Sequence, residues 1–163
     1  MTNFALNIGC GERVFKEYPD GFVCINVDYR NINSADVVAD AKNLPFCNAF
    51  FSYILASDII EHFPIVDTPE VLSEWRRVLN IGGIIEFRMP NLRVICKEYI
   101  NNNHDTRLTS WLLYGGQDYI GNFHYVGFDR DFFKSIISPM GFKELTYREV
   151  GNNFEVTYRK EPL

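Results

Sequence analysis

The sequence has 163 residues, a net charge of −5 and an estimated pI of 5.2, with 47% hydrophobic and 15% aromatic residues. This length predicts one domain over residues 1–163, and the apolar content excludes an intrinsically disordered chain. The chain has no run of basic residues, so we expect no broad nucleic-acid-binding surface.

Four short apolar runs in the first half predict buried strands of a parallel sheet, because they are rich in branched side chains and end near Gly, Pro or Asp. Only the stretch from Glu12 to Gly21 separates the first two runs, so the first helix should be a turn or two at most. The runs cover residues 4–8, 22–27, 35–39 and 51–56.

The best-marked helix follows the fourth strand. Thr68 is a natural N-cap residue, and Pro69 suits the first helical position. Gly82-Gly83 should end this helix before a fifth strand over residues 84–89. The apolar face of the helix consists of Val71, Leu72, Trp75, Val78 and Leu79.

A second helix is predicted after Asn91, which can act as its N-cap. Residues 101–128 then form a long, weakly patterned insert with a short helical piece around residues 110–114. Such an insert in a compact domain is usually functional or disordered, and its many aromatic side chains favour function. Apolar residues recur at helical spacing in the second helix at Leu92, Ile95, Cys96, Tyr99 and Ile100.

The last part of the chain contains one more helix and a hairpin. Asp129 can cap the helix, and Gly141 should end it. Closing strands over residues 143–150 and 153–160 flank the turn Gly151-Asn152. The whole pattern predicts a three-layer α/β domain with a mostly parallel sheet and an antiparallel edge.

Ligands bind such sheets outside the carboxyl ends of the strands. In this sequence, glycines and polar residues gather at those predicted ends. A short apolar run followed by a G-x-G turn can present its backbone to a small charged ligand, and an acid at the end of the next strand suits a ribose. The residues at these ends are Gly9, Gly11, Asp28, Asp40, Ser57 and Asp58.

The cysteines and the N-terminus bear on location and metal binding. The four cysteines form no C-x-x-C pair, and no histidine lies at ligand spacing from them, so we expect neither a metal site nor a disulfide framework. The sequence contains no signal-peptide pattern and no run of about 18 apolar residues. We therefore expect a cytoplasmic protein that does not enter the membrane.

Several segments between residues 4 and 90 occur in an order that resembles the class I S-adenosylmethionine-dependent methyltransferases, in the group labelled methyltransferase type 11. The resemblance implies a Rossmann-like α/β/α fold with a seven-stranded sheet in the order 3-2-1-4-5-7-6 and S-adenosylmethionine as cofactor. The matching segments are Leu6 to Gly11, Asp28, Asp40-Ala41 with Leu44-Pro45-Phe46, Ala56 to His62, and Glu74 to Leu79 leading to Gly82-Gly83.

The resemblance also implies roles for individual residues. The glycine turn would face the methionyl end of the cofactor, Asp28 would hold the ribose, and Asp40 with the Ala41 amide would meet the adenine. The end of the fourth strand would lie beside the sulfonium. The cofactor-binding residues are then Asn7, Gly9, Cys10, Gly11, Asp28, Asp40, Ala41, Ala56 and Ser57.

Two departures from the family pattern affect the site. The distance from Gly11 to Asp28 is shorter than usual, and the first strand lies almost at the start of the chain. An N-terminal cap over the cofactor is therefore not expected. Cover should come from residues 101–128 or from a second subunit, which makes a homodimer an option.

The acceptor side is less clearly marked. We expect a small-molecule or sugar-like acceptor, methylated by in-line displacement without a metal. A base is needed only for a hydroxyl or a protonated amine, and His124 and Asp58 are the candidates. A structural role for His124 stays open, and Glu61 and His62 are expected to give structural support.

Two alternative functions remain. A nicotinamide-dependent oxidoreductase also uses a G-x-G turn followed by an acid, but Val14 stands where the third glycine of G-x-G-x-x-G belongs. The other alternative is a catalytically inactive, methyltransferase-like subunit that binds cofactor or a partner. We also expect no second domain that could hold a hydride acceptor, so the oxidoreductase is the less favoured of the two.

Overall fold

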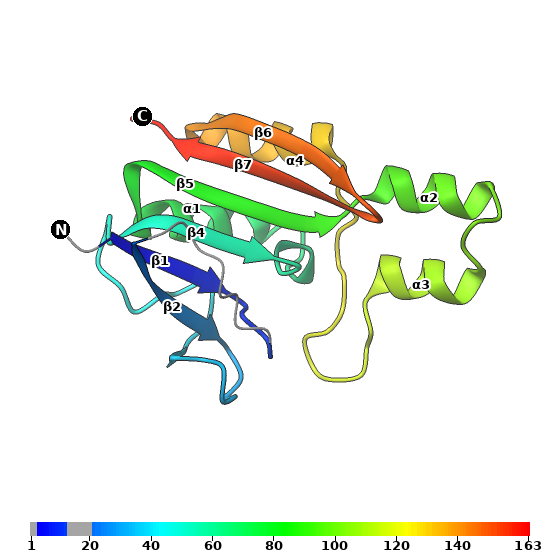
Figure 1. Ribbon diagram of the computed structural model, residues 1–163, viewed down its shortest axis with the longest axis horizontal. Helices are drawn as coiled ribbons and strands as arrows, with labels where there is room; N and C mark the ends of the chain where they lie inside the picture. The colour runs from blue at the N-terminus through cyan, green and yellow to red at the C-terminus, as the bar shows by residue number, and fades with distance from the viewer. Residues whose placement is uncertain (1–2, 13–20) are drawn as a thin grey trace.

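The computed structural model describes residues 3–12 and 21–163, which form a seven-stranded sheet (Figure 1). Its strand order, β3-β2-β1-β4-β5-β7-β6, confirms the order that the sequence predicted. The short first helix predicted after Glu12 falls mainly on residues 13–20, outside the described residues. The strands are β1 Asn3–Ile8, β2 Phe22–Asp28, β3 Val37–Val38, β4 Phe51–Ser57, β5 Leu79–Pro90, β6 Phe142–Val150 and β7 Asn153–Lys160.

The sheet is parallel from β3 to β5 and becomes antiparallel at the end of the chain. β7 runs antiparallel to β5 and to the edge strand β6, so the predicted hairpin and antiparallel edge are confirmed. β3 is shorter than the predicted strand 35–39. The reason is that Asp36 meets β2 partly through its side chain, whose Oδ2 accepts a hydrogen bond from the backbone N–H of Asn26 at 2.8 Å.

Two of the helices pack on one face of the sheet, and two lie beyond the carboxyl end of β5 (Figure 1). The packed pair is α1 and α4, whose aromatic rings contact those of the sheet. Phe87 of β5 contacts Trp75 of α1, Phe133 of α4 and Tyr158 of β7, with centroid distances of 4.8–6.2 Å. Within the described ranges, no helix is long and apolar enough to cross a bilayer. The helices are η1 Ile60–His62, α1 Thr68–Val78, α2 Leu92–Ile100, α3 Thr106–Tyr114, α4 Arg130–Ile137 and η2 Ser138–Met140.

Both predicted boundaries of α1 were wrong. The N-cap is Asp67, and Thr68 is already helical. Gly82-Gly83 does not end the helix, because the chain turns extended at Leu79 and begins β5 there. The glycine pair instead lies in β5 where its register with β4 shifts. Leu79 is fully buried as a strand residue, so the apolar run that predicted a longer helix continues into the sheet.

The predicted apolar face of α2 was also wrong. Of its residues only Ile95 is buried, whereas Cys96 is exposed and Ile100 is 75% exposed. The reason is that α2 leaves the body of the domain and packs mainly with α3 (Figure 1). α3 begins earlier than predicted because the side chain of Asp105 accepts a hydrogen bond from the Leu108 amide at 2.7 Å and caps it.

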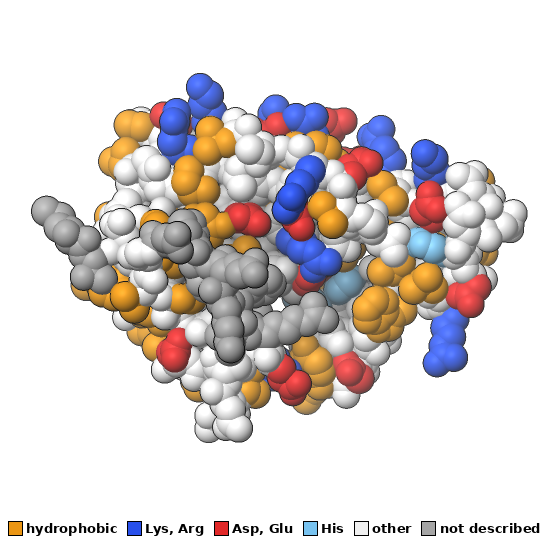
Figure 2. Space-filling view, viewed as in Figure 1, with side chains coloured by type: hydrophobic (Ala, Val, Ile, Leu, Met, Phe, Trp, Pro, Cys, Tyr) orange, Lys and Arg blue, Asp and Glu red, His pale blue; other side chains and the backbone are white. Residues whose placement is uncertain are grey.

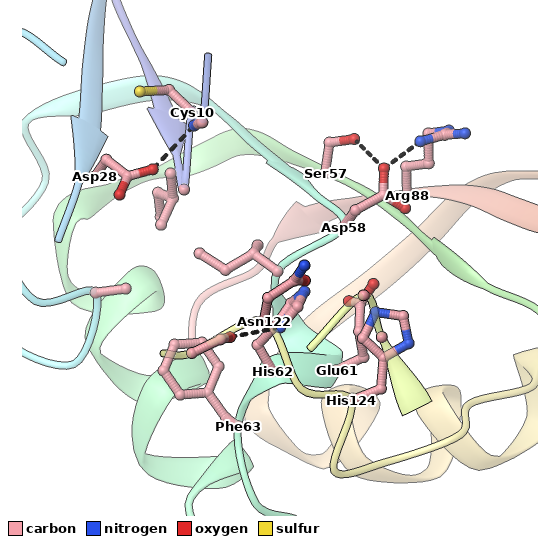
Figure 3. A pocket seen from close by; sticks show the side chains of 18 of the residues that line it. Cys10, Asp28, Ser57, Asp58, Glu61, His62, Phe63, Arg88, Asn122 and His124 are labelled. Atoms are coloured by element: carbon pink, nitrogen blue, oxygen red, sulfur yellow. Dashed lines mark hydrogen bonds and ion pairs between the residues drawn. The ribbon is translucent and has the colours of Figure 1, made fainter. Parts of the chain in front are cut away.

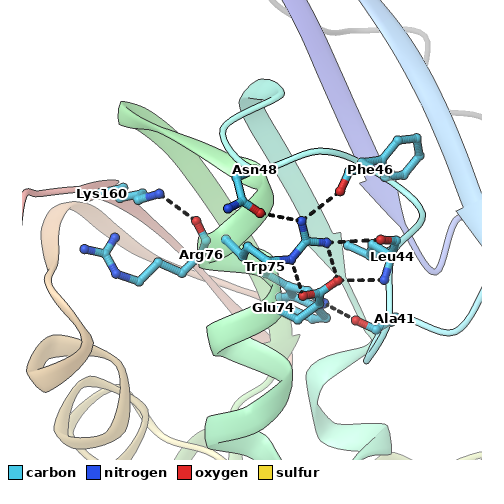
Figure 4. Close-up of polar contacts among 9 residues, drawn as sticks. Ala41, Leu44, Phe46, Asn48, Glu74, Trp75, Arg76 and Lys160 are labelled. Atoms are coloured by element: carbon cyan, nitrogen blue, oxygen red, sulfur yellow. Dashed lines mark hydrogen bonds and ion pairs between the residues drawn. The ribbon is translucent and has the colours of Figure 1, made fainter.

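α1 also holds the loop that follows β3 (Figure 4). The indole Nε1 of Trp75 donates to the carbonyl oxygen of Ala41 at 2.9 Å, and Trp75 is fully buried as predicted. Glu74 accepts a hydrogen bond from the Leu44 amide at 2.7 Å and pairs with Arg77. Arg77 in turn donates to the carbonyl oxygen of Leu44 at 3.1 Å. This network fixes the position of Asp40 and Ala41 at the edge of the sheet.

Candidate functional site

A cavity of about 1140 Å³ lies at the carboxyl ends of β1, β2, β4 and β5 (Figure 3). It brings together nearly all residues that the sequence placed in a site. Ala56 is the exception, since it is fully buried in β4 and does not line the cavity. The predicted residues that line it are Asn7, Gly9, Cys10, Gly11, Asp28, Asp40, Ala41, Ser57, Asp58 and His124.

The turn after β1 requires glycine. Gly9 has a φ of +65°, and a Cβ there would lie 2.3 Å from the Cδ1 atom of Ile59. Cys10 ties the turn to β2, because its amide donates to the carbonyl oxygen of Val27 at 3.0 Å. The side chain of Asn7 donates to Asn26 Oδ1 at 3.0 Å inside the sheet. The turn therefore presents backbone atoms to the cavity on a rigid base.

Asp28 lies at the end of β2, where the sequence predicted an acid facing the ligand. Its Oδ2 accepts a hydrogen bond from the Gly11 amide, and its Oδ1 accepts one from the Arg30 amide, both at 2.9 Å. The Arg30 Nε atom adds an ion pair at 3.1 Å. Burial acts to raise the pKa of this carboxyl, but the hydrogen bonds from Arg30 and Gly11 outweigh it and hold the pKa below its usual value. Asp28 is therefore a carboxylate at neutral pH.

The insert after α3 reaches back over this end of the cavity. Tyr29, next to Asp28, donates a hydrogen bond from its hydroxyl to the carbonyl oxygen of Ile120. The guanidinium of Arg30 lies 4.6 Å from the centre of the Tyr119 ring, a cation–π contact. A Cβ on Gly121 would lie 2.7 Å from the Tyr29 hydroxyl, so the close approach needs glycine there. The sequence allowed two ways to cover the cavity, by residues 101–128 or by a second subunit. These contacts bring residues 101–128 over the cavity within a single chain.

Asp58 forms the opposite wall together with β5 and β7. It has a φ of +51°, which is unusual for a non-glycine residue. Its side chain forms an ion pair with Arg88 and accepts hydrogen bonds from Asn153 Nδ2 at 2.7 Å and Ser57 Oγ at 3.2 Å. These contacts hold the carboxylate in one orientation.

Three further side chains, Glu61, His62 and His124, meet beside Asp58 (Figure 3). One ring nitrogen of each histidine and a carboxylate oxygen of Glu61 all lie within 4.8 Å of one another. The two imidazoles meet edge to face with centroids 4.8 Å apart. Sequence reasoning singled out His124 but read the other two as structural support. The signal for a larger site was weak, because His62 and His124 are far apart in the chain.

Each histidine is oriented by a backbone carbonyl of the insert or of α3. His62 Nδ1 lies 2.9 Å from the Gly121 oxygen, and His124 Nδ1 lies 3.0 Å from the Leu112 oxygen. Because a carbonyl only accepts, Nδ1 carries the proton in both rings and Nε2 carries the lone pair. Burial lowers the pKa of both histidines, and for His62 the neighbouring His124 lowers it further.

Glu61 is the most unusual group in the cavity wall. It is 1% exposed, and neither carboxylate oxygen has a hydrogen-bond partner among the described residues. Burial raises its pKa well above the usual value, and the charge of Asp58 acts in the same direction, against its own amide and Arg88. An unsatisfied buried carboxyl costs free energy, so a group in this position usually has a functional explanation.

The comparisons with known proteins identify a family and a fold. The family model described as Methyltransferase domain matches residues 6–87. The search of curated proteins found no significant match. Among solved structures, a protein from Pyrococcus horikoshii is 20% identical with a TM-score of 0.71, covering 99% of this chain and 83% of that one.

Two other solved structures are similar in fold. A S-adenosylmethionine-dependent methyltransferase from Methanosarcina mazei is 16% identical with a TM-score of 0.68, covering 99% of this chain and 94% of that one. The Burkholderia thailandensis 1,6-didemethyltoxoflavin N1-methyltransferase is 14% identical with a TM-score of 0.69, covering 98% of this chain and 71% of that one. That structure contains bound 1,6-didemethyltoxoflavin and S-adenosylhomocysteine. At these identities the likeness concerns the fold.

Proposed function

The chain belongs to the methyltransferase domain family, within the class I S-adenosylmethionine-dependent enzymes, and on this basis we propose that it methylates a small-molecule or sugar-like acceptor by in-line displacement. One observation carries the proposal. A single cavity contains both the glycine turn with Asp28 at one end and Asp58 with His124 at the other. Donor and acceptor can therefore lie in one line within a shared space.

The cofactor is S-adenosylmethionine, and the residues at the β1–β2 end of the cavity fit it. The turn at Gly9 and Gly11 leaves backbone atoms accessible for the methionyl part. Asp28 stays ionised and already accepts four hydrogen bonds, one from the Gly11 amide and three from Arg30, so a ligand hydroxyl would take over positions that the Arg30 side chain now uses. We assign Asp28 to the ribose hydroxyls, which must share the carboxylate with Arg30.

The remaining cofactor contacts follow from the same geometry. Asp40 and the Ala41 amide lie on the loop held by Trp75, and we assign them to the adenine ring. Ser57, at the end of β4, is assigned to the neighbourhood of the sulfur, with the buried Ala56 supporting it from behind. Asn7 and Cys10 hold the turn through their bonds to β2.

When bound, the cofactor supplies a methyl group that its sulfonium already activates for displacement. The chain must then mainly align the acceptor, which can contribute a large part of the rate enhancement. The insert, held down at Tyr29, excludes water from the cavity. On the acceptor side we assign Asp58 as an orienting carboxylate and His124 as the residue whose Nε2 lone pair meets the acceptor, directly or through a bound cation.

The proposal is tested in two steps. Calorimetry should show that S-adenosylhomocysteine binds one site per chain, while NADH does not bind. The protein is then incubated with methyl-labelled S-adenosylmethionine and a panel of hydroxyl, amine and carboxylate compounds that includes sugars. Label transfer supports an enzyme. Cofactor binding without transfer to any compound, even in cell extract, favours the inactive binding subunit, and tight NADH binding favours the oxidoreductase.

The cellular location and the oligomeric state of the protein can be tested separately. We propose a cytoplasmic location, which fractionation of the native source tests. A homodimer remains an option because several large apolar side chains of the insert are exposed. Light scattering of the purified chain decides the oligomeric state. The exposed residues are Trp111, Tyr114, Ile120 and Tyr125.

A further inference from the structure

We propose that Glu61, His62 and His124 bind one divalent transition-metal ion, such as Zn²⁺, Mn²⁺ or Fe²⁺, on the acceptor side of the cavity. The three residues come from two distant parts of the chain, η1 and the insert. Their candidate ligand atoms lie within 4.8 Å of one another. Ligand atoms at tetrahedral angles around zinc, with bonds of about 2.0–2.2 Å, stand about 3.4 Å apart. The ligand atoms would therefore move closer together by up to about 1.4 Å when an ion binds.

Glu61 is the observation that points to a ligand. Its side chain is 1% exposed and lines the cavity, and no described residue offers either oxygen a hydrogen bond. A buried carboxylate normally has several donors, and leaving it without them is costly. A bound cation would supply the missing partner and the missing positive charge. The nearest guanidinium, Arg88, cannot do so because it forms its ion pairs with Asp58 and Glu155.

The histidines are prepared for the same role. In proteins, a metal-binding histidine almost always donates its other ring N–H to a carbonyl or a carboxylate, which fixes the tautomer and the ring orientation. His62 donates from Nδ1 to Gly121, and His124 donates from Nδ1 to Leu112. The Nε2 lone pair of His124 is therefore available, and both rings are held by backbone atoms, the His62 ring by Phe123 as well as by Gly121. The hydrogen bond from the Tyr125 amide to the Glu61 carbonyl oxygen, at 2.8 Å, holds the two segments together.

The donor set selects the kind of metal. Two imidazoles and one carboxylate suit Zn²⁺, Fe²⁺ and related ions, whereas Ca²⁺ and Mg²⁺ prefer oxygen ligands throughout. Three protein ligands leave one or more positions of the ion open. In Figure 2, a histidine side chain lies close to charged side chains near the centre of the view. Glu61, His62 and His124 all line the cavity, so the open positions of the ion would face it.

The metal site also narrows the acceptor class, and this step rests on the proposed function. An ion with open positions in the cavity binds oxygen atoms and makes a coordinated hydroxyl more acidic. The acceptor is then a compound whose methylated hydroxyl has a neighbouring oxygen, such as a vicinal diol. His124 then acts as a ligand instead of a base, and its Nδ1–H keeps donating to the Leu112 carbonyl oxygen.

The test uses tag-free protein in which the exposed Cys47 and Cys96 are replaced by Ser to remove competing thiolates. Co²⁺ is titrated and followed by the visible absorption of the bound ion. We expect one equivalent per chain. Loss of a second-shell partner alone costs ~10–100-fold in metal affinity, so Glu61→Gln and His124→Gln, which remove a ligand, should each lower it by more than ~100-fold. Acetohydroxamate, a bidentate oxygen ligand, should shift the Co²⁺ spectrum through the open positions.

The matched control is His104→Gln, since His104 is the third histidine of the chain and does not line the cavity. Its Co²⁺ affinity should equal that of the parent protein. Circular dichroism checks that each variant is folded. A parent protein that binds no Co²⁺, or binding that survives both ligand substitutions, overturns the proposal. Calorimetry with S-adenosylhomocysteine is run separately, so that failure of the metal site and failure of the methyltransferase proposal are told apart.

Discussion

The two ends of the cavity are built in opposite ways. At the cofactor end, the polar groups around Gly11 and Asp28 lie close in sequence, and donors already surround the Asp28 carboxylate. At the acceptor end, Glu61 and His124 come from distant segments, and the Glu61 carboxylate has no partner among the described residues. At the cofactor end the chain supplies hydrogen-bond partners for its own carboxylate, whereas at the acceptor end the Glu61 carboxylate is left for what binds there.

This difference suggests that the groups at the cofactor end position a ligand, whereas the groups at the acceptor end take part in the chemistry. Groups that satisfy each other form a rigid surface and contribute to stability. A buried group that the chain leaves unsatisfied costs stability and is retained where it serves a ligand. Variants at the two ends should therefore behave differently, and the following five tests compare them.

The largest effect is expected for Trp75→Ala. Trp75 is fully buried against Phe87, and its indole supports Ala41 at the cofactor end. Removing the ring should lower the free energy of unfolding by about 3–5 kcal/mol. Trp111→Ala is the control, because Trp111 is 58% exposed and a surface change usually stays within about 0.5 kcal/mol. Urea unfolding measures both variants. Equal midpoint concentrations of urea would show that Trp75 does not lie in the core as described.

His124→Ala should separate the acceptor end from the cofactor end. Loss of a base lowers turnover by ~10²–10⁴-fold, and loss of a metal ligand should lower it at least as much. Affinity for S-adenosylhomocysteine should stay within about twofold of the parent, because removal of His124 touches no contact of Asp28. Steady-state rates and calorimetry measure the two quantities. Full turnover in this variant would leave His124 a structural role only.

Asp28→Ala should do the reverse. A hydrogen bond to a charged group contributes about 1.5–3 kcal/mol, so cofactor binding should weaken by that amount. Asp131→Ala, a change of an exposed carboxylate outside the cavity, is the control. Unchanged cofactor affinity in Asp28→Ala would contradict the ribose assignment.

Asp28 also predicts a pH dependence. Its folded pKa lies below the ordinary value of 3.8, so its contribution to stability is fully present above that value and is lost as the pH falls through the folded pKa. The difference in stability between the parent and Asp28→Asn should therefore be constant near neutral pH and shrink below about pH 4. Thermal unfolding at a series of pH values measures it.

The smallest effect is expected for Tyr29→Phe, which removes one hydrogen bond between the insert and the end of β2. Such a bond contributes about 0.5–1.5 kcal/mol, so S-adenosylhomocysteine should dissociate ~2–10-fold faster while turnover chemistry is unchanged. Tyr99→Phe, at a hydroxyl that contacts Thr106 outside the cavity, should have no effect. Equal dissociation rates in both variants would mean that the insert does not hold the cofactor end closed.

The sequence by itself determined the local parts of this protein. Apolar runs ending in glycine or acid predicted the strands, and their ordered motifs predicted the family, the strand order and the residues of the cofactor end. The strands and the turn could be predicted because each depends on neighbours within a few residues, as with the positive φ of Gly9 or the carboxylate at the end of β2. The strand order followed from the resemblance to the family. The helix limits at Thr68 and Leu79 were wrong by a residue or a turn, since an apolar run does not reveal where helix becomes strand.

Only the tertiary structure decided the acceptor end. The helical pattern of α2 gave no sign that the helix leaves the sheet and that Cys96 and Ile100 are exposed, because periodicity records a face but not what covers it. In the same way, no local pattern joins Glu61 to His124. Their meeting depends on the return of the insert over the carboxyl ends of the strands, held by the hydrogen bond from Tyr125 to Glu61. Long-range packing therefore creates the site where the sequence predicted only separate residues.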